Sequence, residues 1–288
     1  MGAAFEVVTG YNSPATTTAG TYTAFTANSG QSFSIRQANG SPAGLVLGPW
    51  GQFGAAGKLQ LKTPRWHDTT NGDTYHVNID TATYEPYPGL ELDDWEPAYA
   101  TDNLTVQMTT DVSQTAITQY TVGLPIYYSD LPGVDGNFMT WQQVIGYRNF
   151  TQKTGLHYVT WVVPSSAGTA GQIGTGVLIN ATNDQYKANH SYALLGYTLS
   201  AGCGSVLIQG TDTGNLYVGG PGIVDHRFTR SWFVKLSRDS GMPLIPIIQA
   251  NNKATTNVFI VDGASTSTAF TVELVWMDLG VIGQPPGV

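Results

Sequence analysis

Short apolar runs separated by turn residues recur along the whole chain. In the segment 58–62, Leu59 and Leu61 alternate with polar residues, which is the period of a strand with one buried face. The pair Asn71-Gly72 predicts a tight hairpin turn, with a return strand at 75–79. The other runs with strand character are 5–8, 22–26, 32–36, 45–47, 158–163, 177–179, 192–197, 206–208, 216–218, 232–236 and 244–248, together with hairpins at 103–131 and 257–279. The pattern therefore predicts an all-β chain.

Two pairs of segments repeat along the chain at nearly one offset. The hairpin at 103–131 resembles that at 257–279, and aligning Asp130 with Asp278 gives an offset of 148 residues. Upstream, 55–63 resembles 201–211, and aligning Lys58 with Ser205 gives an offset of 147 residues. Self-similarity at a fixed period indicates a repeated structural unit. We therefore expect a β-domain duplicated in tandem.

The best boundary between the two copies is the Pro/Gly-rich stretch after Leu131. It predicts a first domain at 1–131, a linker with a short helix at 132–150, and a second domain at 151–288. Helical spacing of Phe138, Trp141, Val144 and Arg148 predicts that helix. Each copy holds about eight predicted strands with frequent turn signals, which is typical of a jelly roll or a related sandwich.

Two irregular segments interrupt this pattern. Three prolines in 84–99 break any regular ladder, so we expect a long excursion from the first domain at a contact surface. The end of the chain, 280–288, carries two prolines and no periodicity, which predicts an extended arm.

Composition narrows the classes of function. Only 11% of the residues are charged, against about 25% in ordinary globular chains, and the formal net charge is −8. A nucleic-acid surface needs clustered Lys and Arg, and the twelve basic residues here form no run. We therefore expect no direct contact with nucleic acid. The start, Met1 to Glu6, lacks the basic and apolar parts of a signal peptide, so we expect either synthesis in the cytoplasm or a signal that has been removed.

Catalytic signatures are missing from the sequence, so we expect no enzyme, no cofactor and no bound metal. It has no zinc-protease, serine-hydrolase or phosphate-loop motif. The glycines of 171–176 have the wrong spacing for a dinucleotide loop. Cys203 is the only cysteine, and its Gly/Ala surroundings favour a small buried side chain over a nucleophile.

Two groups of residues could also carry chemistry. Four carboxylates could hold calcium or serve glycoside hydrolysis, although a solvated acidic loop is favoured; they are Glu91, Asp93, Asp94 and Glu96. The triplet Trp66-His67-Asp68 could form a general-base pair, but neighbours in a strand point to opposite faces. The remaining histidines show no ligand spacing; they are His76, His157, His190 and His226.

A tandem pair of eight-stranded barrels, rich in Thr, Gly and Asn, resembles the double jelly-roll major capsid proteins of tailless icosahedral viruses and bacteriophages. The resemblance is carried by the paired segments described above and by the stretch 132–150 between them, not by a short motif. It implies a homotrimer that forms a pseudo-hexameric capsomer in the virion and contacts neighbouring capsomers and minor or penton proteins. It also implies an internal lipid membrane beneath the shell, although neither end of this chain has the basic or helical segment that such contacts commonly use.

Two other classes of function stay open on the sequence alone. A glycan-binding β-sandwich predicts an exposed aromatic platform, whereas the seven tryptophans here are spread along the chain. A carbohydrate-active enzyme predicts two carboxylates at roughly 5–10 Å in one groove.

Overall fold

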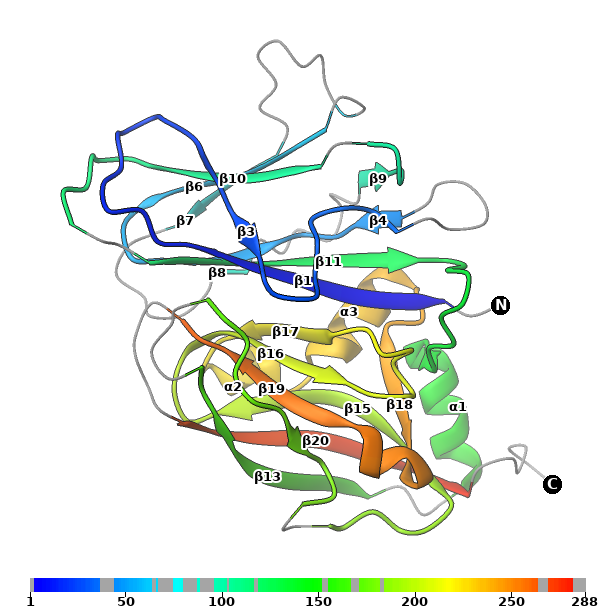
Figure 1. The fold of residues 1–288 in the computed structure, drawn as a ribbon. Helices are drawn as coiled ribbons and strands as arrows, with labels where there is room; N and C mark the ends of the chain where they lie inside the picture. The colour runs from blue at the N-terminus through cyan, green and yellow to red at the C-terminus, as the bar shows by residue number, and fades with distance from the viewer. Residues whose placement is uncertain are drawn as a thin grey trace.

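The computed structural model describes residues 3–36, 44–63, 66, 75–79, 87–88, 96–102, 104–116, 119–151, 155–166, 171–181, 184–263 and 269–281. Within them the chain forms four antiparallel sheets, two from each half of the sequence. Figure 1 shows the sheets of the first half above those of the second. The predicted all-β class is confirmed.

The first half forms one large and one small sheet. The large sheet has the order β3-β1-β11-β4-β9, and β5 and β8 join it beside β11; the small sheet has the order β2-β10-β6-β7. The strands are β1 (Ala4–Asn12), β2 (Thr23–Ala24), β3 (Thr26–Ala27), β4 (Gly44–Val46), β5 (Trp50–Phe53), β6 (Gly57–Lys62), β7 (Tyr75–Ile79), β8 (Tyr87–Pro88), β9 (Glu96–Ala98), β10 (Thr105–Thr110) and β11 (Tyr120–Tyr128).

The second half repeats this arrangement. One sheet has the order β12-β18-β15-β20-β13, and the other has the order β14-β19-β16-β17. The strands are β12 (Phe138–Met139), β13 (Leu156–Pro164), β14 (Val177–Leu178), β15 (His190–Leu199), β16 (Cys203–Gln209), β17 (Val218–Gly222), β18 (Ile245–Gln249), β19 (Asn257–Val261) and β20 (Ala269–Val281).

Strands with the same place in the two halves contain the segments that repeat in the sequence. β6 and β16, which carry Lys58 and Ser205, are each the third strand of a small sheet. β10 and β19 are each the second strand of that sheet, while β11 and β20 each lie beside the first long strand of their half. The segments that repeat in the sequence thus lie in strands that hold the same position in the sheets of the two halves.

Four helical segments accompany the strands: α1 (Trp141–Thr151), α2 (His226–Thr229), α3 (Trp232–Ser240) and the 3₁₀ helix η1 (Ala250–Thr255). α1 is the predicted linker helix, but it begins at Trp141, because Phe138 and Met139 pair with β18 instead. The prediction of a single helix was wrong.

α3 replaces a predicted strand at 232–236. Its buried residues are Trp232, Phe233, Leu236 and Ser237, which lie on one face of a helix and not on alternate positions of a strand. The helix ends at Gly241, whose φ of 72° is the left-handed conformation that favours glycine at this place.

Two further predictions need correction. The segment 32–36 forms bends and not a strand. Parts of 84–99 belong to the large sheet of the first half, because β8 pairs with β5 and β9 pairs with β4. Among the described strands, β8 and β9 each pair on one side only, and proline is tolerated in such edge strands.

The two hydrophobic cores interlock at the junction of the halves. The core of the second half includes first-half residues, among them Phe5, Val7 and Trp50, and Leu216 of the second half lies in the core of the first. The large sheet of the first half contacts the small sheet of the second through β1 with β17 and β11 with β16. The halves therefore pack through two unlike sheets.

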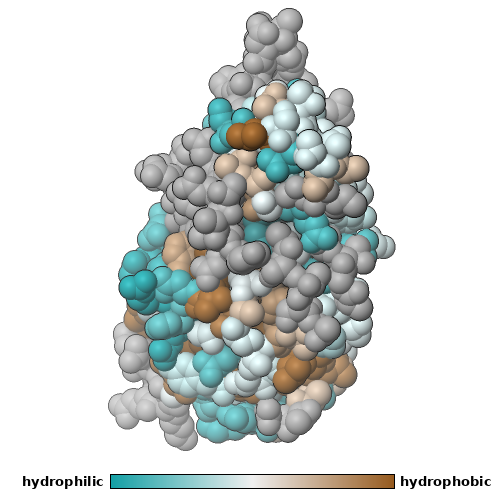
Figure 2. All heavy atoms as spheres, turned by 90° about the vertical axis from the view of Figure 1, so that its left-hand side faces the viewer, coloured by the Kyte–Doolittle hydropathy of each residue, from teal (hydrophilic) through white to brown (hydrophobic). Residues whose placement is uncertain are grey.

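Among the described residues, few large apolar side chains are exposed. The described residues of the face in Figure 2 mix polar and apolar side chains, and the apolar ones occur in separate small groups. Among the described helices, none has the length and apolar character that crossing a bilayer requires.

Candidate functional site

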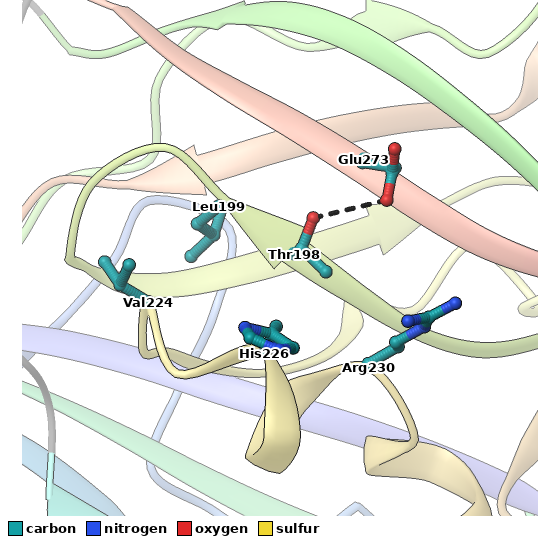
Figure 3. Close-up of a pocket in the computed structure, with 6 residues that line it drawn as sticks. All are labelled: Thr198, Leu199, Val224, His226, Arg230 and Glu273. Carbon is teal, nitrogen blue, oxygen red and sulfur yellow. Dashed lines mark hydrogen bonds between the residues drawn. The ribbon is translucent and has the colours of Figure 1, made fainter.

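An open groove lies on the outer face of the second half, between α2 and the strands β15 and β20 (Figure 3). Its volume is about 390 Å³, and its polar lining comes from Thr198, His226, Arg230 and Glu273. Thr198 Oγ1 donates to Glu273 Oε1 at 3.5 Å. The guanidinium of Arg230 lies 5.0 Å from the centre of the Tyr158 ring and donates to its hydroxyl. The groove thus offers a carboxylate and a guanidinium to polar groups of a partner.

A second polar cluster surrounds Asp278 near the end of β20. The side chain of Asp278 is 2% exposed; its Oδ1 lies 2.7 Å from Nδ1 of His190, and its Oδ2 lies 3.2 Å from Nζ of Lys187 and 3.9 Å from Nε2 of His157. The backbone N–H of Gly280 also donates to Oδ1. Burial raises the pKa of this carboxyl, but the hydrogen bonds from His190, Gly280 and Lys187 outweigh it and lower the pKa below its ordinary value.

Strand pairing explains why this cluster forms. β20 runs between β13 and β15, so that His157 at the start of β13 and His190 at the start of β15 flank the same end of β20. These two histidines are 33 positions apart in sequence, and no local spacing indicated that they meet. Across the part of the chain that the structure describes, no three His, Cys, Asp or Glu side chains are placed to hold a metal ion.

A third site is a hollow of about 310 Å³ at the junction of the halves. Its walls include Tyr11 and Asn28 from the first half, and Gln172, Tyr217 and Phe259 from the second. The Tyr217 and Phe259 rings meet edge to face, with centroids 5.3 Å apart. None of the described residues that line the hollow is charged.

The glycine-rich loop beside this hollow was considered above as a dinucleotide loop and has another role. Gly171 lies so close to the first half that a Cβ there would be 2.1 Å from Cβ of Tyr11. Its backbone N–H donates to the Asp262 carbonyl, and its own carbonyl accepts from Asn28 Nδ2 at 2.7 Å. The loop therefore links the two halves.

The other candidate residues lie apart from these three sites. Cys203 is fully buried, and burial raises the pKa of its thiol well above the ordinary value. Trp66 donates to the carbonyl of Pro97 at 2.8 Å. Glu96 is exposed in β9. The acidic-loop residues Glu91, Asp93 and Asp94 lie outside the described residues, as do His67, Asp68, the side chain of His76 and the arm 282–288.

Comparison with known proteins gives only weak likenesses. No family model matches the chain, and no curated protein matches its sequence. Among solved structures, the exported protein XepA of PBSX matches with 12% identity and a TM-score of 0.25, over 95% of this chain and 86% of that one. An archaeal-virus protein with a triple jelly-roll fold matches with 10% identity and a TM-score of 0.21, over 93% and 59%. The major capsid protein P2 of bacteriophage PM2 matches with 7% identity and a TM-score of 0.21, over 99% and 100%.

Proposed function

We propose that this chain is the major capsid protein of a tailless icosahedral virus, folded as two tandem jelly-roll barrels. The order of the strands carries the proposal. If the eight main strands of each half are numbered along the chain, omitting β3, β5, β8 and β12, both halves have one sheet in the order 1-8-3-6 and one in the order 2-7-4-5. This is the order that the Greek keys of a jelly roll produce. The barrels would occupy 1–131 and 151–288, with 132–150 between them.

The packing of the halves supports assembly into rings. Within the chain, the 1-8-3-6 sheet of the first barrel contacts the 2-7-4-5 sheet of the second. This leaves two unlike sheets that do not pack on the other half, one at each end of the molecule in Figure 1. One is β2-β10-β6-β7, and the other is the sheet that contains β13, β20 and β15, where α1, α2 and α3 cover parts of β20 and β15 and leave β13 uncovered. A head-to-tail contact of this kind closes into a ring when it repeats with the right rotation. Three chains would then make a ring of six barrels.

The free outer face of β13 is suited to such a contact. Leu156 and Val162 lie on this face and are 49% and 66% exposed, while Val159, Trp161 and Val163 point into the core. The groove of Figure 3 lies on the same sheet, through Thr198 and Glu273. A neighbouring subunit would cover both. The trimer, its contacts with neighbouring capsomers and minor or penton proteins, and its place in the virion all belong to this proposal.

The mass of the purified protein in solution tests it. We expect light scattering and native mass spectrometry to give a trimer or a larger shell-like particle, with a six-lobed outline by electron microscopy. The Val162→Glu variant should shift the population toward monomer at least tenfold. Leu178→Glu is the matched control, because Leu178 is 38% exposed and lies in β14, outside both of the sheets at the ends of the molecule. A wild-type protein that stays monomeric at high micromolar concentration would overturn the proposal.

A further inference from the structure

The hollow at the junction has the chemistry of a site for an uncharged polar ring. Small-molecule sites are concave, largely lined by apolar and aromatic groups, and carry a few placed polar groups; a volume of about 310 Å³ lies at the lower end of their range. The Tyr11, Tyr217 and Phe259 side chains are each half-buried, so part of each remains in contact with solvent. The hollow is therefore open to a ligand and is not a sealed packing defect.

Asn28 gives the hollow an amide oxygen that the described protein groups leave free for a ligand. The residue is 4% exposed, and its Nδ2 donates to Thr9 Oγ1 at 2.9 Å and to the Gly171 carbonyl at 2.7 Å. A carbonyl only accepts, so the Gly171 contact fixes which way the amide faces. Its Oδ1 accepts no hydrogen bond from the described residues.

The other polar groups can both donate and accept. Gln172 Nε2 donates to the Tyr11 hydroxyl at 3.5 Å, which leaves its Oε1 as an acceptor, and Ser29 adds an exposed hydroxyl at the edge. Amides and hydroxyls of this kind match sugar hydroxyls, each of which also donates and accepts. Because the described lining residues are all uncharged, phosphates, carboxylates and amines are disfavoured as ligands.

From these observations we infer that the hollow binds a neutral hexopyranose unit of an oligosaccharide. The apolar C–H face of the sugar ring packs on Tyr217 and Phe259, and its hydroxyls bond Asn28 Oδ1, Gln172 and Ser29. The site uses residues from both halves, so it exists only when the halves are packed together. It is independent of the proposed capsid role, since it needs one chain alone.

Saturation-transfer NMR on the purified full chain tests the inference. The probes are methyl glycosides of glucose, galactose and mannose, neutral trisaccharides ending in each, sialyllactose, and adenosine. We expect saturation of the ring C–H protons of at least one neutral hexose, with tighter binding of the matching trisaccharide. Signals that are absent for all neutral sugars at millimolar concentration, or that are strongest for sialyllactose or adenosine, would overturn it.

Two variants locate the binding. Ser29→Tyr places a ring across the opening and should weaken binding at least tenfold, and Phe259→Leu should weaken it severalfold. Ser32→Tyr is the matched control, because Ser32 is an exposed serine of the same segment that does not line the hollow. The thermal midpoint of each variant shows that it is folded. Full binding by folded Ser29→Tyr would also overturn the inference.

Discussion

The indole Nε1 of Trp50 donates a hydrogen bond of 2.9 Å to Oγ of Ser205, a residue 155 positions away on the other side of the junction. Both side chains are buried, and the ring of Trp50 also meets Trp232 edge to face with centroids 5.9 Å apart. Removing one partner of a buried hydrogen bond lowers stability because the other partner is left buried without a hydrogen bond. This bond therefore couples the two halves energetically.

The coupling is measurable by a double-mutant cycle. Ser205→Ala should lower the free energy of unfolding by about 1–3 kcal/mol, because it leaves the Trp50 N–H buried without a partner. Trp50→Phe should lower it by a similar or larger amount. In urea unfolding, the double variant should lose less than the sum, with an interaction energy of about 1 kcal/mol. Additive losses would show that the bond contributes nothing.

Gly123 of β11 should tolerate no side chain. It lies opposite Trp50 in the register of β11 with β5, and a Cβ there would be 2.1 Å from Cε2 of the indole. We expect Gly123→Ala to lower the free energy of unfolding by about 3 kcal/mol or to prevent folding. Gly146→Ala in α1 is the control, since its Cβ would meet nothing within 4 Å; it should stabilise the helix by about 0.5–1 kcal/mol. Equal effects of the two changes in urea unfolding would contradict this account.

Ionisation of the Asp278 carboxyl should make the free energy of unfolding depend on pH. Its folded-state pKa lies below the ordinary value, which for an aspartate in the unfolded chain is about 3.9. The stabilisation that ionised Asp278 provides is therefore fully present above its unfolded-state pKa. It is lost as the pH falls through the lower folded-state pKa. The Asp278→Asn variant should have a lower free energy of unfolding than the wild-type protein at pH 7, and this difference should shrink as the pH approaches 3. Urea unfolding at several pH values measures this, with the exposed Asp111→Asn as control. A deficit that does not change with pH would contradict it.

Cys203 should be unreactive while the chain is folded. Burial raises the pKa of its thiol, and the thiolate is the reactive form. We expect a chromogenic thiol reagent at pH 8 to leave the native protein unmodified over minutes and to modify one thiol per chain in denaturant. A protein with Val112→Cys, whose new thiol would be exposed, should gain one fast-reacting group. Fast reaction of native wild-type protein would show that the site opens.

Strands were predictable from the sequence where a short pattern of apolar and polar residues identifies them. Alternation in β6 and the apolar runs of β16 and β20 mark strands without any knowledge of their partners. α3 was missed because its five apolar-rich residues at 232–236 fit both periods. Only the longer window, from Ser231 before the helix to Gly241 after it, distinguishes a helix.

The candidate sites were not predictable in the same way. His157, His190 and Asp278 come together because β13 and β15 pair with opposite edges of β20, and pairing partners leave no local trace in the sequence. The hollow draws on segments near residues 11, 28, 172, 217 and 259. Its aromatic rings look like ordinary core residues until the packing of the halves leaves space between them.

The exchange of residues between the two cores limits how the molecule can be divided. Expressed alone, the first half would expose Phe5, Val7 and Trp50, and the second would lose the side chains that fill its core. Each fragment would thus expose apolar surface to water where it normally packs on the other half. We therefore expect neither half to fold alone, and the intact chain to unfold without a separate transition for either half.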